Sequence, residues 1–528
     1  MTEFLLKVAA SAASACLFSA CTFKMLGAMQ QAGYKNGVFL RWLKRKENMQ
    51  FNRLAVLSLC LALSVAIVSL CFSFLGVIEA LAVSAIPFAV LCMLFIWADR
   101  KYALKVKTVY TGRLKRLVIG YGFTLGVIGY VWIAFLGFLK DWNGSELYGL
   151  IAYVPFAVMP LLLPALLCLA NGVLSIFENI RNEKFVKLAG TVLNETEILR
   201  IGVVGSYGKT SVKNILKTLL SEKYTVVETP ASYNTPVGIA KTVCSPEFAH
   251  KQIFIAEMGA RKAGDIAELC GLVKPDYAVF TGICEQHIET FGSLEDVWRE
   301  KSEIFHCGAK AVVCGDTLRG RIEESESITF ACGVKDVVTT LTNTECTLIL
   351  GGQEIKIKSK LLGASAVENI RLAATLAFAL GMTAEEIAQG IAKLQPVPHR
   401  LQLIENGGVY ILDDGYNCNI QGAKAALQLL STHTGRKCVV TPGIVECGVL
   451  EERINGELGV LLATANVDKI ILVGQTLVGA VKTGYLQADG GSEAIEQTPT
   501  LAAAQTLLSE WTQRGDAVLF LNDLPDVY

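Results

Sequence analysis

The sequence of 528 residues lacks several features that mark common functional classes. Lysine and arginine together number 48, and so do aspartate and glutamate, so no excess of positive charge is present to attract a nucleic acid. None of the 16 cysteines belongs to a C-x-x-C pair, which excludes a zinc ribbon of the usual ligand spacing. The cysteines are scattered, often among apolar neighbours, and are expected to be reduced. We therefore expect neither a nucleic-acid partner nor a zinc ribbon.

Apolar side chains are abundant: they make up 52% of the residues, whereas 18% are charged. The apolar fraction is high for a soluble enzyme, and the charged fraction is high for a transporter. The averages therefore conceal two regions of different composition. At roughly 100–200 residues per domain, the length predicts about three domains. Stretches long enough to cross about 30 Å of hydrocarbon occur at residues 4–29, 54–77, 79–98, 117–139 and 148–170. Residues 1–180 are thus predicted to form a multi-pass α-helical membrane domain with five transmembrane helices.

Basic residues in the predicted loops give the orientation of these helices, because cytoplasmic loops carry an excess of lysine and arginine. Loop 30–53 contains six such residues and loop 99–116 contains seven, whereas the loops around Glu79 and Asp141 contain almost none. Five helices then place the N-terminus outside and everything after the last helix in the cytoplasm. Only Lys7 precedes the first apolar stretch, which favours a retained anchor over a cleaved signal peptide. The expected location is the cell membrane, with the remaining domains on its cytoplasmic side.

Two further segments of this region bear on its contact with lipid and water. Residues Gln30–Arg45 mix aromatic side chains with cations, which is typical of a segment that lies against anionic headgroups. A specific lipid or sugar-phosphate site in that segment is the alternative. Glu79 is expected in a short joint between the second and third helices, where water keeps its carboxylate solvated.

From about residue 185 onward, short β-branched strands alternate with helices, which predicts parallel α/β units. The clearest motif is Ile201-Gly-Val-Val-Gly-Ser-Tyr-Gly-Lys-Thr-Ser211, a strand that enters a Gly-rich turn before a helix. Its glycines leave backbone N–H groups free to face a phosphate, Lys209 can reach the terminal phosphates, and Thr210 can ligate Mg²⁺. Val203 replaces the first glycine of the longer G-x-x-x-x-G-K-[ST] pattern. A purely structural strand, turn and helix is the alternative.

Further motifs follow this loop in a fixed order. They are the Asn-rich loop Ser232-Tyr-Asn-Thr-Pro-Val-Gly238, the strand Ile253-Phe-Ile-Ala-Glu257, the turn Cys284-Glu-Gln-His287 and the strand with its polar turn Tyr410-Ile-Leu-Asp-Asp-Gly-Tyr-Asn-Cys-Asn419. With these motifs, the chain from about residue 200 to 528 resembles the Mur ligase family, the ATP-dependent amino acid or peptide ligases of cell-wall assembly. The resemblance implies a P-loop central ATP-binding domain at 185–396 and a Rossmann-like C-terminal domain at 397–528.

The resemblance also implies roles for the residues that match the family's motifs. The implied ATP contacts are Gly205, Ser206, Gly208, Lys209, Thr210, Ser211, Asn369, Arg400 and Asp414. The implied substrate contacts are Asn234, Thr235, Tyr416 and Asn417. Two Mg²⁺ ions would be held by Thr210, Glu257, His287 and Lys301, with Lys301 carbamylated so that its cation becomes a carboxylate-like anion. The implied catalytic residues are Lys209, Lys301, His287 and Arg400.

Each of these residue types has a structural explanation as well. Asn234 or Glu257 could cap a helix, and Lys301 could be an ordinary lysine on a helix surface. Arg400 could pair with an acid at a strand edge. The adjacent acids Asp413 and Asp414 could merely cap the next helix.

The sequence departs from the family in three places. Ala364-Ser-Ala366 stands where members often have a His-Asn pair that contacts the base. In the C-terminal domain, Gly443-Ile-Val-Glu446 matches the family only in part, and Leu521-Asn-Asp-Leu-Pro-Asp526 replaces a common Lys-Gly-Ser segment, so the incoming amine is inferred by analogy. The predicted membrane domain takes the place of the small α/β domain that grips UDP in soluble members.

The resemblance implies an ADP-forming ligase in which ATP phosphorylates a muramoyl-peptide carboxylate and an amine then attacks the acyl phosphate. The amine is expected to be D-alanyl-D-alanine, and the acceptor is UDP-linked or lipid-linked. A ligase that elongates poly-γ-glutamate or a similar capsule polymer is the alternative. A transporter would need intramembrane charges, which are nearly absent, and a dead scaffold would be expected to lose Lys209, Glu257, His287 or Lys301.

Overall fold

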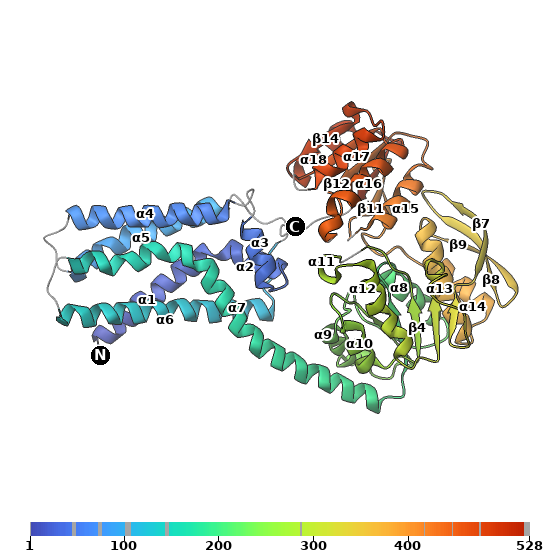
Figure 1. The fold of residues 1–528 in the computed structure, drawn as a ribbon, viewed down its shortest axis with the longest axis horizontal. Helices are drawn as coiled ribbons and strands as arrows, with labels where there is room; N and C mark the ends of the chain where they lie inside the picture. The colour runs from blue at the N-terminus through green and yellow to red at the C-terminus, as the bar shows by residue number, and fades with distance from the viewer. Residues whose placement is uncertain are drawn as a thin grey trace. The chain divides into compact units, whose positions relative to one another are not determined.

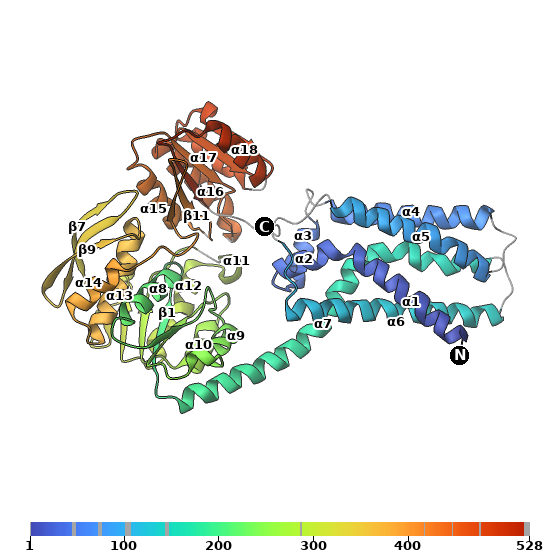
Figure 2. The same ribbon diagram turned by 180° about the vertical axis from the view of Figure 1, so that it is seen from behind.

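The computed structural model describes residues 2–44, 49–71, 77–100, 107–142, 147–285, 288–416, 418–445, 447–474 and 477–521. The chain forms two compact units, Met1–Arg181 and Asn182–Asp523, and each is described by itself. Figures 1 and 2 show the first unit as a helical region and the second as sheets covered by helices. The α/β character predicted for the second unit is confirmed.

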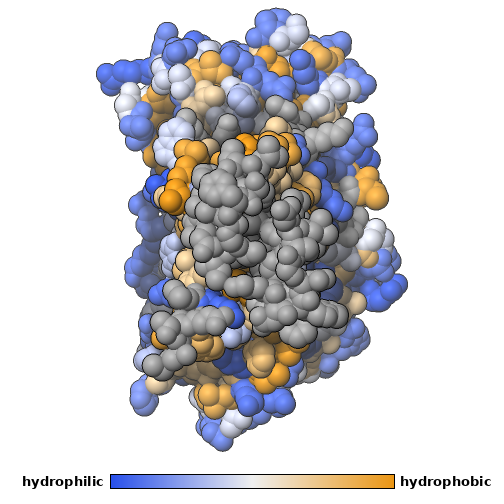
Figure 3. Space-filling view, turned by 90° about the vertical axis from the view of Figure 1, so that its left-hand side faces the viewer, coloured by the Kyte–Doolittle hydropathy of each residue, from blue (hydrophilic) through white to orange (hydrophobic). Residues whose placement is uncertain are grey.

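Most helices of the first unit are largely apolar around their whole circumference, as helices buried in protein or lipid are, whereas the short α3 has a polar face. They are α1 Thr2–Cys21, α2 Phe23–Gln31, α3 Asn36–Lys44, α4 Gln50–Cys71, α5 Val77–Asp99, α6 Gly112–Trp142 and α7 Leu147–Glu195, the last of which continues into the second unit. Phe18, Phe39 and Tyr121 lie in the core between them. Figure 3 looks onto one end of this region, and the residues of high hydropathy that it colours lie around the atoms drawn in grey.

By length and composition, two helical segments of the described residues are able to cross a membrane: Gly112–Phe135 and Ala157–Glu195. A third candidate is the pair Lys7–Cys21 and Phe23–Gln31, which is bent by 54°. In the predicted stretches 54–77 and 79–98 the structure has α4 Gln50–Cys71, of 22 residues, and α5 Val77–Asp99, of 23 residues, and their segments Gln50–Ser64 and Ala85–Asp99 are apolar. Within the described residues, the structure therefore provides two candidate spans, or three with the bent pair, and the five spans stay a prediction.

Two local predictions for this region are corrected. The first apolar stretch is not one helix, because it bends at Thr22, whose side chain donates a hydrogen bond to the carbonyl of Ser19 at 2.7 Å. Such back-bonding by threonine bends helices. Glu79 belongs to the first turn of α5 rather than to a joint, since the helix already begins at Val77.

The second unit begins with a six-stranded parallel sheet in the order β2-β3-β1-β4-β5-β6. The strands are β1 Leu199–Val204, β2 Val226–Glu228, β3 Ile253–Glu257, β4 Tyr277–Phe280, β5 Ala311–Cys314 and β6 Ile328–Phe330. They read as short apolar runs because helices bury both faces of a parallel sheet. The helices are α8 Lys209–Leu220, α9 Pro236–Val243, α10 Asp265–Val273, α11 Ile288–Phe291, α12 Leu294–Lys301, α13 Ala364–Ala379 and α14 Ala384–Ala392.

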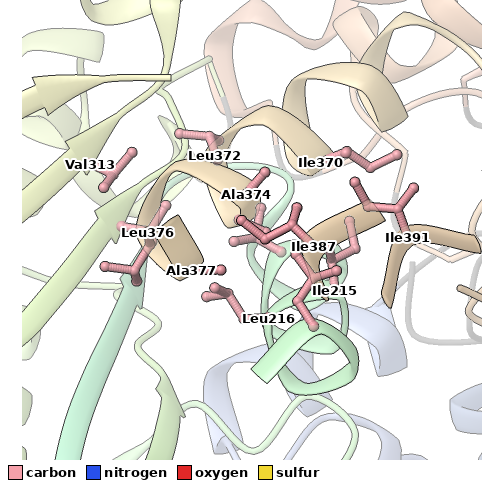
Figure 4. Close-up of a cluster of buried hydrophobic side chains, with 14 of the residues drawn as sticks. Ile215, Leu216, Val313, Ile370, Leu372, Ala374, Leu376, Ala377, Ile387 and Ile391 are labelled. Atoms are coloured by element: carbon pink, nitrogen blue, oxygen red, sulfur yellow. The ribbon is translucent and has the colours of Figure 1, made fainter. Parts of the chain in front are cut away.

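Apolar side chains from α8, α13 and α14 pack together against this sheet (Figure 4). Leu216 of α8, Leu376 of α13 and Ile387 of α14 are fully buried there. This packing fixes the start of α8, which follows the Gly-rich loop. A separate antiparallel sheet follows, made of β7 Gly333–Thr339, β8 Thr344–Leu350 and β9 Gln353–Ser359.

The last part of the chain forms a second six-stranded sheet in the order β10-β11-β15-β12-β13-β14, in which only β10 runs antiparallel. Its strands are β10 Gln402–Asn406, β11 Val409–Asp414, β12 Lys437–Thr441, β13 Lys469–Val473, β14 Ile495–Thr498 and β15 Ala517–Leu521. Its helices are α15 Ile420–Leu430, α16 Glu451–Thr464, α17 Val478–Gln487 and α18 Leu501–Trp511. In both sheets, some of the polar residues predicted for the site lie at the carboxyl end of a strand: Glu257 ends β3 and Asp414 ends β11.

Candidate functional site

The Gly-rich loop leaves the carboxyl end of β1, which lies between β3 and β4 in the sheet. Gly205 has φ of 152°, and a Cβ there would lie 1.9 Å from Oγ1 of Thr281. Gly208 is left-handed at φ 75° and precedes the first residue of α8. A Cβ on Gly208 would lie 2.6 Å from Oδ1 of Asn369, so the loop packs directly against that predicted nucleotide contact. Glycine is required at both positions because no larger residue fits.

Lys209 begins α8 and folds back over its own loop. Its ammonium donates hydrogen bonds to the carbonyls of Gly205 at 2.6 Å and Ser206 at 3.2 Å. Burial is the main cause that lowers the pKa of Lys209, and the nearby charge of Arg400 lowers it further. The ammonium therefore lies at the mouth of the loop, where a phosphate bound to the backbone N–H groups would meet it.

Glu257 ends β3, and the strand register sets it opposite Val203, two residues before the Gly-rich loop. Its Oε2 accepts a hydrogen bond from the Thr210 hydroxyl at 2.9 Å, and its Oε1 accepts one from the Asn234 amide at 3.2 Å. Three predicted site residues from separate elements thus meet at one carboxylate. Neither capping alternative holds. The N-cap residue of α10, the first α-helix after Glu257, is Gly264. Thr235, not Asn234, caps α9, and it accepts a 3.3 Å hydrogen bond from the backbone N–H of Gly238. Thr235, predicted as a substrate contact, has this structural role.

Lys213 is a member of this cluster that the sequence analysis did not identify. Its side chain is only 1% exposed and lies 3.3 Å from Oε2 of Glu257. The ammonium also donates to the carbonyls of Thr229 at 2.7 Å and Ala231 at 2.5 Å, in the segment that leads to Asn234. It therefore compensates the carboxylate and holds the Asn-rich loop beside it. Its position one helical turn after Lys209 was the available signal, because residues four apart share a helix face.

Lys301, at the end of α12, is buried rather than on a helix surface, with 2% of the residue exposed. Its ammonium donates to the carbonyl of Gly205 at 3.1 Å, the same oxygen that accepts from Lys209. Burial lowers the pKa of Lys301 to about 7, and the neighbouring charge of Lys209 contributes in the same direction. The structure thus brings Lys301, Lys209 and the Gly-rich loop together.

The C-terminal sheet contributes residues from the turn after β11 and from the segment before β10. Arg400 lies between two residues with left-handed backbone, His399 and Leu401, and its guanidinium carbon lies 4.4 Å from the ring centre of Tyr416. The Tyr416 hydroxyl is 2.9 Å from the Ser232 hydroxyl of the Asn-rich loop. The sequence left open that Arg400 pairs with an acid at a strand edge. Asp413, near the end of β11, instead lies 2.7 Å from Nδ1 of His399.

Asp414 is buried, and this burial raises its pKa to about 6. Its Oδ1 accepts a hydrogen bond from the backbone N–H of Leu401 at 3.1 Å. It does not cap α15, because Asn419 is the capping residue and accepts from the backbone N–H of Gly422 at 2.9 Å. A second contact between the two parts of this unit joins Arg453 of α16 to Glu285, which follows β4.

Some predicted residues cannot be placed in the site. His287 and Asn417 lie outside the described residues, as does Glu446. Ser206 is buried in the loop, and Ser211 lies in the first turn of α8. Among the residues that the structure describes, no group of three or more His, Cys, Asp or Glu side chains is arranged to hold a metal ion.

Comparisons with known proteins agree with this geometry. Residues 203–377 match the Mur ligase middle domain, and residues 399–522 match the domain described as Mur ligase, glutamate ligase domain. The chain is 30% identical over 352 residues to the UDP-N-acetylmuramoyl-tripeptide–D-alanyl-D-alanine ligase of Bacillus subtilis (strain 168), which covers 63% of this chain and 75% of that protein. The enzyme of the same name from Escherichia coli (strain K12) is 30% identical over 311 residues, covering 55% and 68%.

Among solved structures, the MurF ligase from Thermotoga maritima in complex with ADP superposes with a TM-score of 0.59 at 26% identity, covering 65% of this chain and 80% of that one. The matched domains include the Gly-rich loop, the carboxylate at the end of β3 and the turn after β11. These likenesses extend over both α/β parts of the second unit. The chain belongs to the Mur ligase family.

Proposed function

We propose that this chain is an ATP-dependent, ADP-forming ligase that joins D-alanyl-D-alanine to a muramoyl-tripeptide in peptidoglycan precursor synthesis. The observation that carries the proposal is the cluster of Lys209, Lys301, Thr210, Glu257 and Asn234 around one Gly-rich loop. It lies in a chain that is 30% identical to the Bacillus subtilis ligase over three quarters of that enzyme's length.

In the first step, a carboxylate oxygen of the acceptor forms a bond to the γ-phosphorus of ATP, and the bond between that phosphorus and the β–γ bridging oxygen breaks to release ADP. Catalysis of such a transfer consists of positioning and charge neutralisation. The N–H groups of the loop Gly205–Ser211 would hold the phosphates. Lys209 would exchange the carbonyls of Gly205 and Ser206 for phosphate oxygens. Arg400, whose charge already acts on Lys209, would add a second cation.

In the second step, the amine nitrogen of the incoming dipeptide bonds to the acyl carbon, phosphate leaves with the bond pair, and the nitrogen loses its proton. The acyl phosphate must be kept from water until the amine arrives. Tyr416 and Ser232 are the contacts that join the C-terminal part to the Asn-rich loop, beside Asn234. We propose that the amine binds on this side of the site.

Magnesium fits the donor atoms of the site, because it prefers oxygen ligands and is held by few carboxylates together with phosphates. The Thr210 hydroxyl, the Glu257 carboxylate and the Asn234 side chain supply oxygens within one cluster. Mg²⁺ bound there would neutralise phosphate charge. We extend the proposal to a second ion, held by His287 and by Lys301 in carbamylated form. A lysine with a pKa of about 7 has the neutral amine that reacts with carbon dioxide.

We further propose that the helical region anchors the enzyme in the cell membrane, with the α/β domains in the cytoplasm. The length and apolar character of Gly112–Phe135 and Ala157–Glu195 support this location. The same region favours a lipid-linked acceptor as an alternative to the UDP-linked one, since it takes the place of the domain that grips UDP in soluble family members.

The test measures ADP release by the full-length protein in detergent with Mg²⁺, D-alanyl-D-alanine and either UDP-linked or lipid-linked muramoyl-tripeptide. Turnover should require both substrates and should fall by at least about a hundredfold in Lys209→Ala, the order seen when one charge-stabilising group is removed. Lys217→Ala is the matched control, because Lys217 lies on the same helix and pairs with Glu228 at the surface. No product with either acceptor would refute the assignment, and a polymeric product would favour the capsule alternative.

A further inference from the structure

A cluster of charged and polar side chains lies where α6 begins and the apolar part of α7 ends, beside the turn between α2 and α3 (Figures 1 and 2). Nothing in the ligase reaction uses these residues. We call them the arginine seam. Its members are Arg113 and Arg116 of α6, Ser175, Glu178 and Arg181 of α7, and Tyr34 of the turn.

Tyr34 is held in an unusual conformation that supports Arg113. Its φ is 61°, directly after Gly33 at 60°, so two consecutive residues are left-handed. Such a backbone is strained for a residue with a side chain and persists only where the surroundings enforce it. Here the Tyr34 carbonyl accepts from the buried Asn171 amide at 2.9 Å, and the Tyr34 ring centre lies 4.1 Å from the guanidinium carbon of Arg113. The turn is therefore built to position this arginine.

The seam has more positive than negative charge. Glu178, with a side chain 5% exposed, accepts hydrogen bonds at 2.6 Å from both Arg116 and Arg181. The third guanidinium, that of Arg113, donates to the Ser175 hydroxyl at 3.3 Å. Three cations thus share one carboxylate. The side chains of Arg116 and Arg181 remain 41% and 57% exposed, and each guanidinium carries five N–H donors, so donors stay available to an anion.

Exposed apolar side chains continue from these arginines along both helices. On α6, Ile119, Phe123 and Val127 follow Arg116 at spacings that keep them on one helix face. On α7, Phe177 is exposed one turn before Arg181. A free anion would need only the cations, whereas a lipid would use the cations for its head group and the apolar faces for its chain.

We propose that the arginine seam binds the head group of a lipid that carries a phosphomonoester or diphosphate, with the lipid chain along the exposed faces of α6 and α7. Two or more negative charges match the excess of cations, and guanidinium groups bind phosphate oxygens in pairs. This inference rests on the proposed function only in one respect, because a lipid-linked acceptor of the ligase would carry such a head group.

Binding is tested with the full-length protein in phosphatidylcholine nanodiscs and a radiolabelled polyprenyl diphosphate as the probe. Arg116→Gln and Arg181→Gln should each weaken binding about tenfold, the effect of losing one charge-assisted contact. Arg116→Lys should also weaken it, because lysine keeps the charge but lacks the planar fork. Lys115→Gln removes an exposed cation from the position directly before Arg116 on the same helix, and it should leave probe binding unchanged.

Three results would overturn the inference. Equal weakening by Lys115→Gln and Arg116→Gln would mean that bulk electrostatics attracts the probe. Displacement by inorganic pyrophosphate as effective as displacement by unlabelled lipid would mean a soluble anion site. Displacement by phosphatidylglycerol at equal concentration would mean that any anionic lipid suffices. Arg116→Lys and Arg181→Gln keep the test decisive if Arg116→Gln fails to fold.

Neither ATP nor turnover enters this measurement. If the unmodified protein ligates the UDP-linked acceptor but does not bind the probe, only the inference about the arginine seam is refuted. Probe binding without ligation of either acceptor would refute only the proposed ligase.

Discussion

At the scale of single residues, Lys301 is the group whose chemistry depends most on its surroundings. Burial, with help from the charge of Lys209, lowers its pKa to about 7. Below that pH the amine is protonated and cannot react with carbon dioxide, and above it the amine is free to form the carbamate. We therefore expect ADP release to fall as the pH drops through about 7, and bicarbonate to restore most activity near that pH. The assay compares carbon dioxide-depleted buffer with bicarbonate-supplemented buffer across the pH range.

The same shift predicts the effect of Lys301 on stability. An unfolded lysine has a pKa of about 10.4, so between this value and about 7 the unfolded chain binds more protons, and stability rises with pH over that window. The penalty for burying the charged amine is complete below about 7. Lys301→Met should thus melt at a higher temperature than the unmodified protein at low pH while losing its activity. An active Lys301→Met enzyme, indifferent to bicarbonate, would show that Lys301 is not modified.

The residue scale also shows what the sequence could reveal about the site. Lys209 and Thr210 were predictable because the loop that contains them is a local pattern of glycines and polar residues. Glu257 was predictable because a lone carboxylate ends an apolar strand. The burial of Lys213 was not predictable, since its acceptors, the carbonyls of Thr229 and Ala231, are brought to it by the fold.

At the scale of elements, α16 and α17 of the C-terminal domain make their contact through glycine. A Cβ on Gly484 of α17 would lie 2.0 Å from the carbonyl oxygen of Gly456, and one on Gly459 of α16 would lie 2.1 Å from that of Val481. The two backbones touch directly, so an added methyl group must push the helices apart. Gly484→Ala should destabilise the domain by about 1–3 kcal/mol, as overpacking does.

Gly456→Ala is the matched control, because a Cβ at that position meets nothing within 4 Å. Alanine in the middle of a helix is favoured over glycine by roughly 0.5–1 kcal/mol, so this variant should be slightly more stable. Thermal unfolding of the full-length protein in detergent provides the comparison. A melting temperature in Gly484→Ala as high as in Gly456→Ala would show that the helices separate without cost.

Elements with a strong local pattern were predictable, and those set by distant contacts were not. Strands β12, β13 and β15 of the predicted Rossmann-like domain are largely buried apolar runs of five residues, which is the local pattern of a strand inside a parallel sheet. The sheet of β7, β8 and β9 was missed because several of its residues are exposed on both faces, which weakens the apolar signal. The bend after α1 was missed because it arises from a hydrogen bond of Thr22 within an unbroken apolar stretch.

At the scale of the whole molecule, the helical region presents apolar side chains that a water-exposed surface rarely gathers in such number. Phe123 and Val131 of α6 and Val173 and Ile176 of α7 are examples, and all are exposed in the structure. Lipid would cover these side chains, as the predicted membrane location requires. The number of helices that cross remains the decisive quantity, because it determines on which side the N-terminus lies.

We predict that the protein stays with the membrane fraction in high salt and carbonate and is released only by detergent, because the contact between the helical region and lipid is apolar.

Exposed Cys244, in the α/β unit, should react with a membrane-impermeant maleimide in inverted vesicles but not in intact spheroplasts, with Cys244→Ser as control. With that unit in the cytoplasm, an odd number of spans places an N-terminal epitope outside and an even number places it inside. Three or five spans therefore predict an epitope that antibody reaches on spheroplasts, whereas an epitope reached only after permeabilisation would mean an even number of spans, such as Gly112–Phe135 and Ala157–Glu195 alone. Extraction by salt alone would contradict any spanning arrangement.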